Sequence, residues 1–395
     1  MNFKSKNMNR KNPALRAALM FILLFGVISA LGDTTYEGAR SIYGNYLLYL
    51  GADAAIIGFI TGLGEFLGYA VRLISGYIVD KTHNSWIVTI IGYVMIISVP
   101  LLAFTNSWET AAILINSERL GKAIRSPGKD TLISHASKLL GSGYGFGLSE
   151  AMDQVGAIIG PLIFAFVLLY LNSYKTGFTI LWIPTIFLII IVLYTRFKYP
   201  NPEKMESEPI VEGNFQSLKS RKFIYYMLFI FFSVFGFVTF PILSYYFLNH
   251  HIMGPAMVPT LYAVAMALDG VFALFIGKVY DKKGNRILYL IPIMTVLMIL
   301  LVFNNNLILA ILAIMFWGCT MGIHETILKA NIADMVPMDS RGKAYGIFNT
   351  VYGFAFLIGS SLIGVIYAIS TNYIILIVLI VEFISVLMLY KSKIT

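Results

Sequence analysis

The chain has 395 residues, of which 58% are apolar or aromatic and only 12% are charged. That charged fraction is about half the value for a soluble domain, so the composition excludes an ordinary water-soluble protein. The net charge of +9 would suit a nucleic-acid partner, but the charges follow membrane topology, so we expect no nucleic-acid binding. The single cysteine, Cys319, excludes a disulfide framework and a cysteine-based metal site.

Long apolar segments, separated by glycine, proline and charged residues, predict twelve membrane-spanning helices, because one span needs roughly 20 apolar residues. These runs are too long and continuous for the strands of a spanning barrel. The basic N-terminus and first apolar run resemble a signal peptide, but eleven further runs favour an uncleaved first helix. The predicted spans are residues 16–42, 53–80, 84–104, 108–136, 143–170, 176–197, 222–248, 255–280, 286–304, 307–334, 343–369 and 372–391.

The loops after the even-numbered spans, together with both termini, hold nearly all the Lys and Arg residues outside the spans, whereas the opposite loops hold little beyond Arg40 and Lys175. The positive-inside bias therefore predicts that both termini are cytoplasmic. The polar stretch between the sixth and seventh spans carries several Pro and Glu residues, as a hydrated linker does. We predict a six-helix bundle at residues 1–197, a cytoplasmic linker at 198–221 and a second six-helix bundle at 222–395.

An internal repeat supports this division. The pattern Gly-x-x-x-Asp-Lys at residues 76–81 recurs at 277–282, and Tyr-Gly at residues 144–145 recurs at 345–346. Both repeats have the same offset of 201 residues, which indicates duplicated halves. Since six spans is an even number, both halves enter the membrane from the same side as parallel repeats.

The two loops resemble the signature loop of the major facilitator superfamily of transporters. Glycine permits close approach of helices, and a carboxylate can cap a neighbouring helix N-terminus. The resemblance implies that Asp80 and Asp281 help to hold the outward-facing state together at the cytoplasmic side. The first copy departs from the pattern, because Thr82, His83 and Asn84 replace the usual glycine and basic residues. The residues to which the resemblance assigns cytoplasmic gating are Gly76, Asp80, Lys81, Gly277, Asp281, Lys282 and Arg286.

The fourth span is similar to the Arg-x-x-x-Gly region of the superfamily's fourth helix. Its positions 118, 122, 125 and 129 share one helical face, which either lines a cavity or snorkels to the cytoplasm. We favour snorkelling for Arg125 and Lys129, and leave a membrane-embedded role for Arg119 open.

In the fifth span, Gly156-x-x-x-Gly160-Pro161 resembles the superfamily's antiporter motif, although Ile163 and Phe164 replace its usual glycine pair. Small residues let helices pack closely, and proline bends a span. Packing alone would account for the motif, while the resemblance favours export.

Ionisable side chains inside a span cost several kcal/mol, so they are candidates for function. In the superfamily, helices 1, 2, 4, 5, 7, 8, 10 and 11 line the cavity, and most embedded charges here fall on those helices, including Asp269 in span eight. A buried carboxylate can exchange a proton in each transport cycle; the alternative is that these charges are neutralised structural pairs. The candidates for proton coupling are, in order, Asp153, Glu37, Glu65, Asp33, Glu150 and Glu325. The candidates for the substrate cavity are Arg40, Arg72, Arg119, His324 and Lys329.

No nucleotide-binding loop occurs, so energy must come from an ion or substrate gradient. We predict a proton-coupled exporter of an amphipathic organic compound or drug. The alternative is an importer, either a symporter or a facilitator, of a small metabolite such as an anionic one. A membrane sensor or lipid enzyme is a third class, but no nucleophile, base or metal cluster has a recognisable spacing. We therefore expect no enzyme activity, no cofactor and no metal, with protons or Na⁺ as the coupling ion, in a monomeric multi-pass protein of the cytoplasmic membrane.

Overall fold

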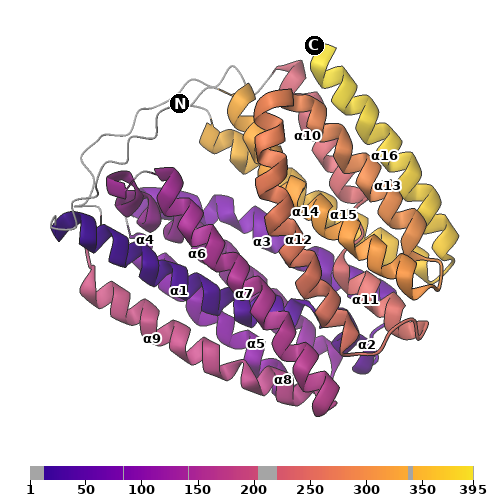
Figure 1. Cartoon of the computed structure of the whole chain (residues 1–395), viewed down its shortest axis with the longest axis horizontal. Coiled ribbons are helices and arrows are strands. Elements are labelled where there is room, and N and C mark those ends of the chain that lie inside the picture. The colour runs from indigo at the N-terminus through magenta and orange to yellow at the C-terminus, as the bar shows by residue number, and fades with distance from the viewer. Residues whose placement is uncertain (1–12, 83, 141, 203–219, 337–340, 395) are drawn as a thin grey trace.

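The computed structural model describes residues 13–82, 84–140, 142–202, 220–336 and 341–394, and within these ranges the regular structure is helical throughout (Figure 1). Ten helical stretches are long and apolar enough to cross a membrane. One of them, Met257–Val302, contains two successive helices, whereas the charge-rich helix Trp108–Leu140 is not among the ten. An all-helical fold of apolar spans is thus confirmed, and the count of twelve stays a prediction.

The first group of helices corresponds to the first six predicted spans. It comprises α1 (Pro13–Arg40), α2 (Tyr43–Tyr49), α3 (Ala54–Thr82), α4 (Ser85–Val94), α5 (Ser98–Leu101), α6 (Trp108–Leu140), α7 (Ser142–Tyr170), α8 (Tyr174–Ile180) and α9 (Trp182–Lys198), with short 3₁₀ turns, η1 (Met95–Ile97) and η2 (Leu102–Phe104), on either side of α5.

The second group follows the linker, of which residues 203–219 lie outside the described part of the chain. It comprises α10 (Arg221–Phe235), α11 (Phe240–Asn249), α12 (Met257–Lys283), the 3₁₀ helix η5 (Gly284–Tyr289), α13 (Leu290–Val302), α14 (Leu307–Met335), α15 (Arg341–Tyr367) and α16 (Thr371–Ile394). Each predicted span agrees with one or more helices to within four residues at either end.

The break between α10 and α11 was not predicted. Pro241, in the first turn of α11, lacks the backbone N–H that a continuous helix would use. A residue distant in the sequence satisfies a carbonyl at the break, since the Trp317 indole donates to the Val238 carbonyl at 3.0 Å. Irregular backbone at membrane depth is tolerated where protein buries it, and Phe237 and Val238 are fully buried here.

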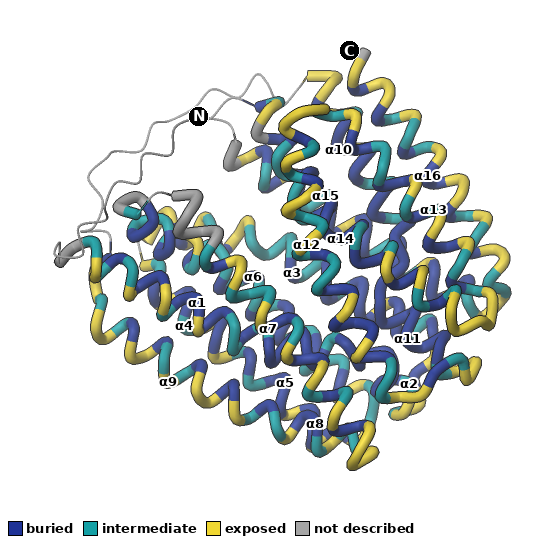
Figure 2. Tube along the Cα trace, viewed as in Figure 1, coloured by how far each residue is buried: buried dark blue, intermediate teal, exposed yellow. Residues whose placement is uncertain are grey.

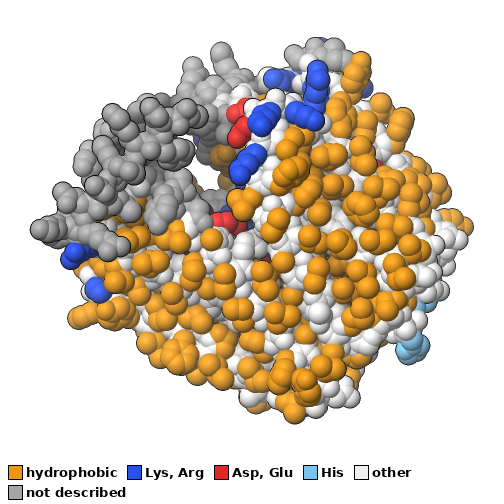
Figure 3. All heavy atoms as spheres, in the orientation of Figure 1, with side chains coloured by type: hydrophobic (Ala, Val, Ile, Leu, Met, Phe, Trp, Pro, Cys, Tyr) orange, Lys and Arg blue, Asp and Glu red, His pale blue; other side chains and the backbone are white. Residues whose placement is uncertain are grey.

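Exposed positions lie along the outer faces of the helices (Figure 2), and the outer surface seen in Figure 3 is largely hydrophobic. The outward faces of α9 and α16 expose large side chains such as Phe187 and Phe383, whereas the buried positions lie between helices. A soluble monomer does not expose so large a continuous apolar surface. This surface is what a protein solvated by lipid requires.

The two groups of helices meet where α3 packs on α15 and α11, α7 on α12, and α2 on α11. The last is very close, because a Cβ built at Gly44 would lie 2.0 Å from the Pro241 carbonyl oxygen. We call the end of the bundle formed by α2 and α11 the hairpin end, and the end where α9 stops and α10 starts the linker end. Figure 1 shows the two groups splaying apart towards the linker end.

Candidate functional site

A cavity of about 230 Å³ lies between the two groups of helices. Its walls come from α1, α3, α4, α6 and α7 on one side and from α12 and α14 on the other. Seven carboxylate and six basic side chains line it, so the cavity is intensely charged although it lies inside an apolar bundle. Charges in such a place must be paired, hydrated or exchanged with a ligand.

One charged network sits at the end of α1, beside the hairpin end of the cavity. Arg40 contacts the carboxylates of both Glu65, at 2.6 Å, and Glu37, at 3.4 Å. Arg119 lies 3.8 Å from the same Glu65 oxygen, and these two residues line a small adjoining pocket rather than the main cavity. The Tyr262 hydroxyl donates to Glu37 at 2.5 Å and so links α12 to α1 across the two groups of helices.

Replacing Tyr262 with phenylalanine is expected to destabilise the protein by about 1.5–3 kcal/mol, because it removes a hydrogen bond to a buried charge. Tyr226→Phe is the matched control: Tyr226 is equally buried but donates to a neutral carbonyl, that of Leu328, at 2.9 Å, which predicts a loss of about 1 kcal/mol. Thermal unfolding in detergent measures both. Equal losses would show that the charge of Glu37 adds nothing to the bond.

A second ion pair joins α6 to α7, where Lys129 lies 3.1 Å from Asp153. Arg125 is also turned inward: it is 5% exposed and lies 3.4 Å from the fully buried Glu118. Snorkelling of Arg125 and Lys129 is therefore wrong for this structure. Glu118 and Asp153 compensate the charges of Arg125 and Lys129 inside the bundle. Neither cation therefore has to extend to water to be stabilised.

Tyr36 of α1 forms the centre of a cluster of cations. Lys122 hydrogen-bonds to its hydroxyl, and the Lys122 ammonium also lies 4.0 Å from the ring centroid. The guanidinium groups of Arg119 and Arg125 lie 5.5 and 5.8 Å from the same centroid. An organic cation could therefore bind the aromatic face of Tyr36 only in competition with these three side-chain cations.

Five carboxylates of the cavity wall have no ion-pair partner within 4 Å among the described residues, namely Asp33, Asp130, Glu150, Asp269 and Glu325. Asp269 is only 3% exposed, on the part of α12 that faces the cavity. By contrast Asp153, Glu37 and Glu65, the first three candidates from the sequence, are each paired with a cation. The structure thus distinguishes the acids that are paired with a cation from those that are not. The sequence alone did not make this distinction.

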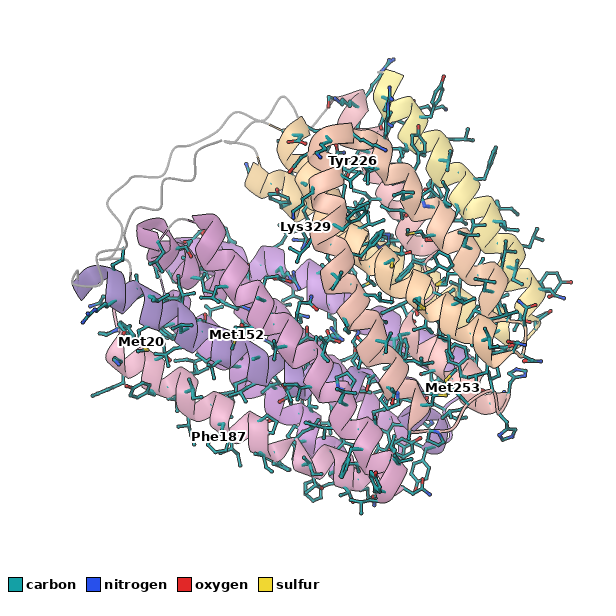
Figure 4. All side chains as sticks on the ribbon, viewed as in Figure 1. Met20, Met152, Phe187, Tyr226, Met253 and Lys329 are labelled. Atoms are coloured by element: carbon teal, nitrogen blue, oxygen red, sulfur yellow. The ribbon has the colours of Figure 1, made fainter. Side chains whose placement is uncertain are left out.

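The predicted basic residues divide in the same way. Arg72 and Lys329 line the main cavity and, within the described ranges, form no ion pair. Arg72 donates to the Gly68 carbonyl at 2.8 Å, and Figure 4 places Lys329 on the side of α14 turned towards the other group of helices. Arg40 and Arg119 are occupied by the glutamates described above.

His324 does not line the main cavity. It is 1% exposed, lies 3.4 Å from the Tyr352 hydroxyl and packs against the ring of Phe237. Sequence reasoning also missed Glu382 of α16, a buried acid whose two carboxyl oxygens have no hydrogen-bond partner of ordinary geometry among the residues that the structure describes. A lone Glu in an apolar run was the available signal.

The glycines of the fifth-helix motif pack α7 against α1. A Cβ at Gly156 would lie 2.2 Å from the Ala30 carbonyl oxygen, and one at Gly160 would lie 2.3 Å from that of Thr34. Pro161 follows inside the same helix. Close packing, one of the two interpretations of this motif, is therefore present in the structure.

The two Gly-x-x-x-Asp-Lys loops, to which the resemblance assigns gating, differ from expectation in this conformation. A Cβ at Gly277 would meet no atom within 4 Å, and one at Gly76 would approach only Pro127, at 3.8 Å, so neither glycine makes the expected close helix contact. Asn84, rather than Asp80, caps α4 by accepting from the Ile87 amide at 3.4 Å. These contacts are missing because the helices are separated at the linker end, where Asp80 is exposed.

The second loop turns at Gly284, whose φ of +59° favours glycine. The position 201 residues earlier is His83, outside the described residues.

Comparison with known proteins identifies the family. The family model described as Major Facilitator Superfamily matches residues 15–351 and 237–393. An uncharacterized protein of Mycobacterium tuberculosis is 38% identical over 387 residues, covering 96% of this chain and 94% of its own length. An uncharacterized MFS-type transporter of Methanocaldococcus jannaschii is 28% identical over 375 residues, covering 92% and 93%.

Solved transporters share the fold. The nucleoside transporter NupG has a TM-score of 0.71 at 17% identity, covering 95% of this chain and 98% of its own. A bacterial homolog of the human lysosomal transporter Spinster, inward-facing and unoccupied, has a TM-score of 0.69 at 12% identity, covering 96% and 95%. With the family model matched along nearly its whole length, the chain belongs to the Major Facilitator Superfamily and is a multi-pass membrane transporter.

Proposed function

We propose that this transporter exports an amphipathic organic compound in exchange for protons. The observation that carries the proposal is the continuity of the charged cavity with a more apolar one of about 640 Å³ between α7 and α12. Six residues line both spaces: Glu150, Gln154, Met266, Asp269, Glu325 and Lys329. A ligand with a polar and an apolar part fits this junction, because one ligand can occupy both environments.

The charge at the junction favours a cationic compound, since three carboxylates there face the single ammonium of Lys329. Asp269, Glu150 and Glu325 lack an ion-pair partner among the described residues, as does Asp33 across the cavity. An unpaired acid that is as little exposed as Asp269, at 3%, is stabilised either by a proton or by a bound cation. Exchange between those two states is proton-coupled export, and Asp269, a buried acid at the junction itself, is its principal carrier.

The proposal includes twelve spans, two six-helix bundles and cytoplasmic termini. The ten stretches identified by composition become twelve spans when α6 is added and the stretch Met257–Val302 is counted as two spans, α12 and α13. The distribution of Lys and Arg puts the linker end in the cytoplasm. The cavity then opens towards the cytoplasm, the state from which an exporter loads its substrate.

Import of an anionic metabolite is the second candidate. Arg72 and Lys329 favour it, because both line the cavity and neither is neutralised by a described carboxylate. Protein reconstituted in liposomes separates the candidates: a compound found by thermal-shift screening should move outward against an inwardly directed proton gradient. Accumulation in the direction of proton entry would support import instead.

Replacing Asp269 with asparagine is expected to lower pH-gradient-driven transport at least tenfold, equivalent to about 1.4 kcal/mol, while exchange without a gradient continues. The amide keeps the shape but accepts no proton. Asp53→Asn is the control, because Asp53 is exposed and its role as cap to the Ile56 amide suits asparagine equally. Undiminished pH-driven transport in the Asp269→Asn protein would remove Asp269 from coupling.

A further inference from the structure

A separate groove lies on the lipid-facing side of the second gating loop. It encloses about 1160 Å³ between α12 and the segment formed by η5 and the start of α13. Its lower wall is apolar and includes Phe272, Phe275 and Val279; Phe275 is 61% exposed. The groove shares no lining residue with the central cavity.

The upper wall of the groove is basic. Lys278, Lys282, Lys283 and Arg286 line it, all four are exposed, and no ion pair joins any of them to a described carboxylate. Figure 3 shows Lys and Arg side chains gathered over the upper end of α12, above a continuous apolar surface. The groove therefore has a strongly positive rim and an apolar wall.

The duplicated loop provides an internal comparison. At the same offset of 201 residues, the first loop has Tyr77, Lys81, Thr82 and Ser85. Three of the four cations are thus peculiar to the second loop, whereas the Gly-x-x-x-Asp-Lys pattern is common to both. A gating role accounts for the shared pattern and, by the resemblance, for Arg286, but it leaves Lys278 and Lys283 unexplained.

We propose that this groove binds an anionic phospholipid of the bilayer. The phosphate lies among the ammonium and guanidinium groups, which are strong donors to phosphate oxygens, and the acyl chains cover the apolar wall. A free anion would satisfy the cations but leave the apolar wall uncovered, which is why a lipid fits better. The groove lies at the linker end of the bundle, which the positive-inside bias places on the cytoplasmic side of the membrane. Anionic headgroups are present in that leaflet.

Binding is tested with the purified full-length protein in a mild detergent. The probes are phosphatidylglycerol and phosphatidylcholine with identical acyl chains, and bound lipid is counted by native mass spectrometry. We expect phosphatidylglycerol to bind at least tenfold more tightly. The variant Lys278→Gln/Lys283→Gln/Arg286→Gln, which keeps Lys282 of the shared pattern, should lose at least fivefold of that affinity.

The matched control is Lys198→Gln/Arg221→Gln/Lys222→Gln, which removes three exposed cations from the same end of the bundle and should keep wild-type binding. If the triple variant does not fold, the single change Lys283→Gln tests the proposal instead. We expect it to lose about twofold of the affinity for phosphatidylglycerol. Equal binding of the two lipids, or an equal loss in the control, overturns the proposal. Displacement of phosphatidylglycerol by millimolar inorganic phosphate identifies a free-anion site instead.

Discussion

Replacing Arg40 with glutamine is expected to lower the free energy of unfolding by about 3–5 kcal/mol, the cost of breaking a buried ion pair by removing one partner. Arg40 compensates both Glu37 and Glu65, and its side chain is only 13% exposed. After the change Glu65 keeps Arg119 at 3.8 Å, a longer contact, and Glu37 keeps the hydroxyl of Tyr262. Thermal unfolding of the purified protein measures the loss.

The double change Arg40→Gln/Glu65→Gln tests whether charge is the cause. It removes one negative and one positive group together, so we expect it to be more stable than Arg40→Gln alone. A double variant at least as unstable as the single one would assign the effect to the shape of the arginine rather than to its charge. Lys175→Gln, at an exposed position that contacts Asn106, should change stability by less than about 0.5 kcal/mol.

Much of the fold was predictable, because apolar runs and the residues that interrupt them set the helix ends. The ends of α14, at Leu307 and Met335, were predicted to within one residue, and in the structure Asn306 caps its first turn. The break before α11 was not predicted. The break depends on Pro241 and also on Trp317, which is distant in the sequence. Trp317 can donate to the Val238 carbonyl only after the helices have packed.

The candidate site was only partly predictable. Sequence spacing shows that Glu37 and Arg40 lie on one helical face, and their contact at 3.4 Å agrees with it. Spacing says nothing about partners on other helices, and these decide which acids are neutralised. Asp153 finds Lys129 on α6, whereas Asp269 finds no cation within 4 Å in the described chain.

Replacing Gly160 with alanine is expected to destabilise the protein by about 1–3 kcal/mol. The new methyl carbon would lie 2.3 Å from the Thr34 carbonyl oxygen and 2.7 Å from the Gly38 nitrogen, and both are backbone atoms that cannot turn aside. Helices α1 and α7 must then move apart. The same change at Gly277 is the control, because open space surrounds it; alanine there should be neutral or stabilising by up to about 1 kcal/mol.

The separation of α1 and α7 in the Gly160→Ala protein is also expected to affect transport. A Cβ at Gly156, one turn before Gly160, would lie 2.9 Å from the Cβ of Asp33, so the glycines set how closely α7 approaches that acid. Asp153 lies one further turn back, on the same cavity wall. If the motif acts by packing, the Gly160→Ala protein should lose stability and pH-driven transport together. Wild-type stability with lost transport would instead mean that the glycine is needed in another conformation of the cycle, where α1 and α7 approach more closely still.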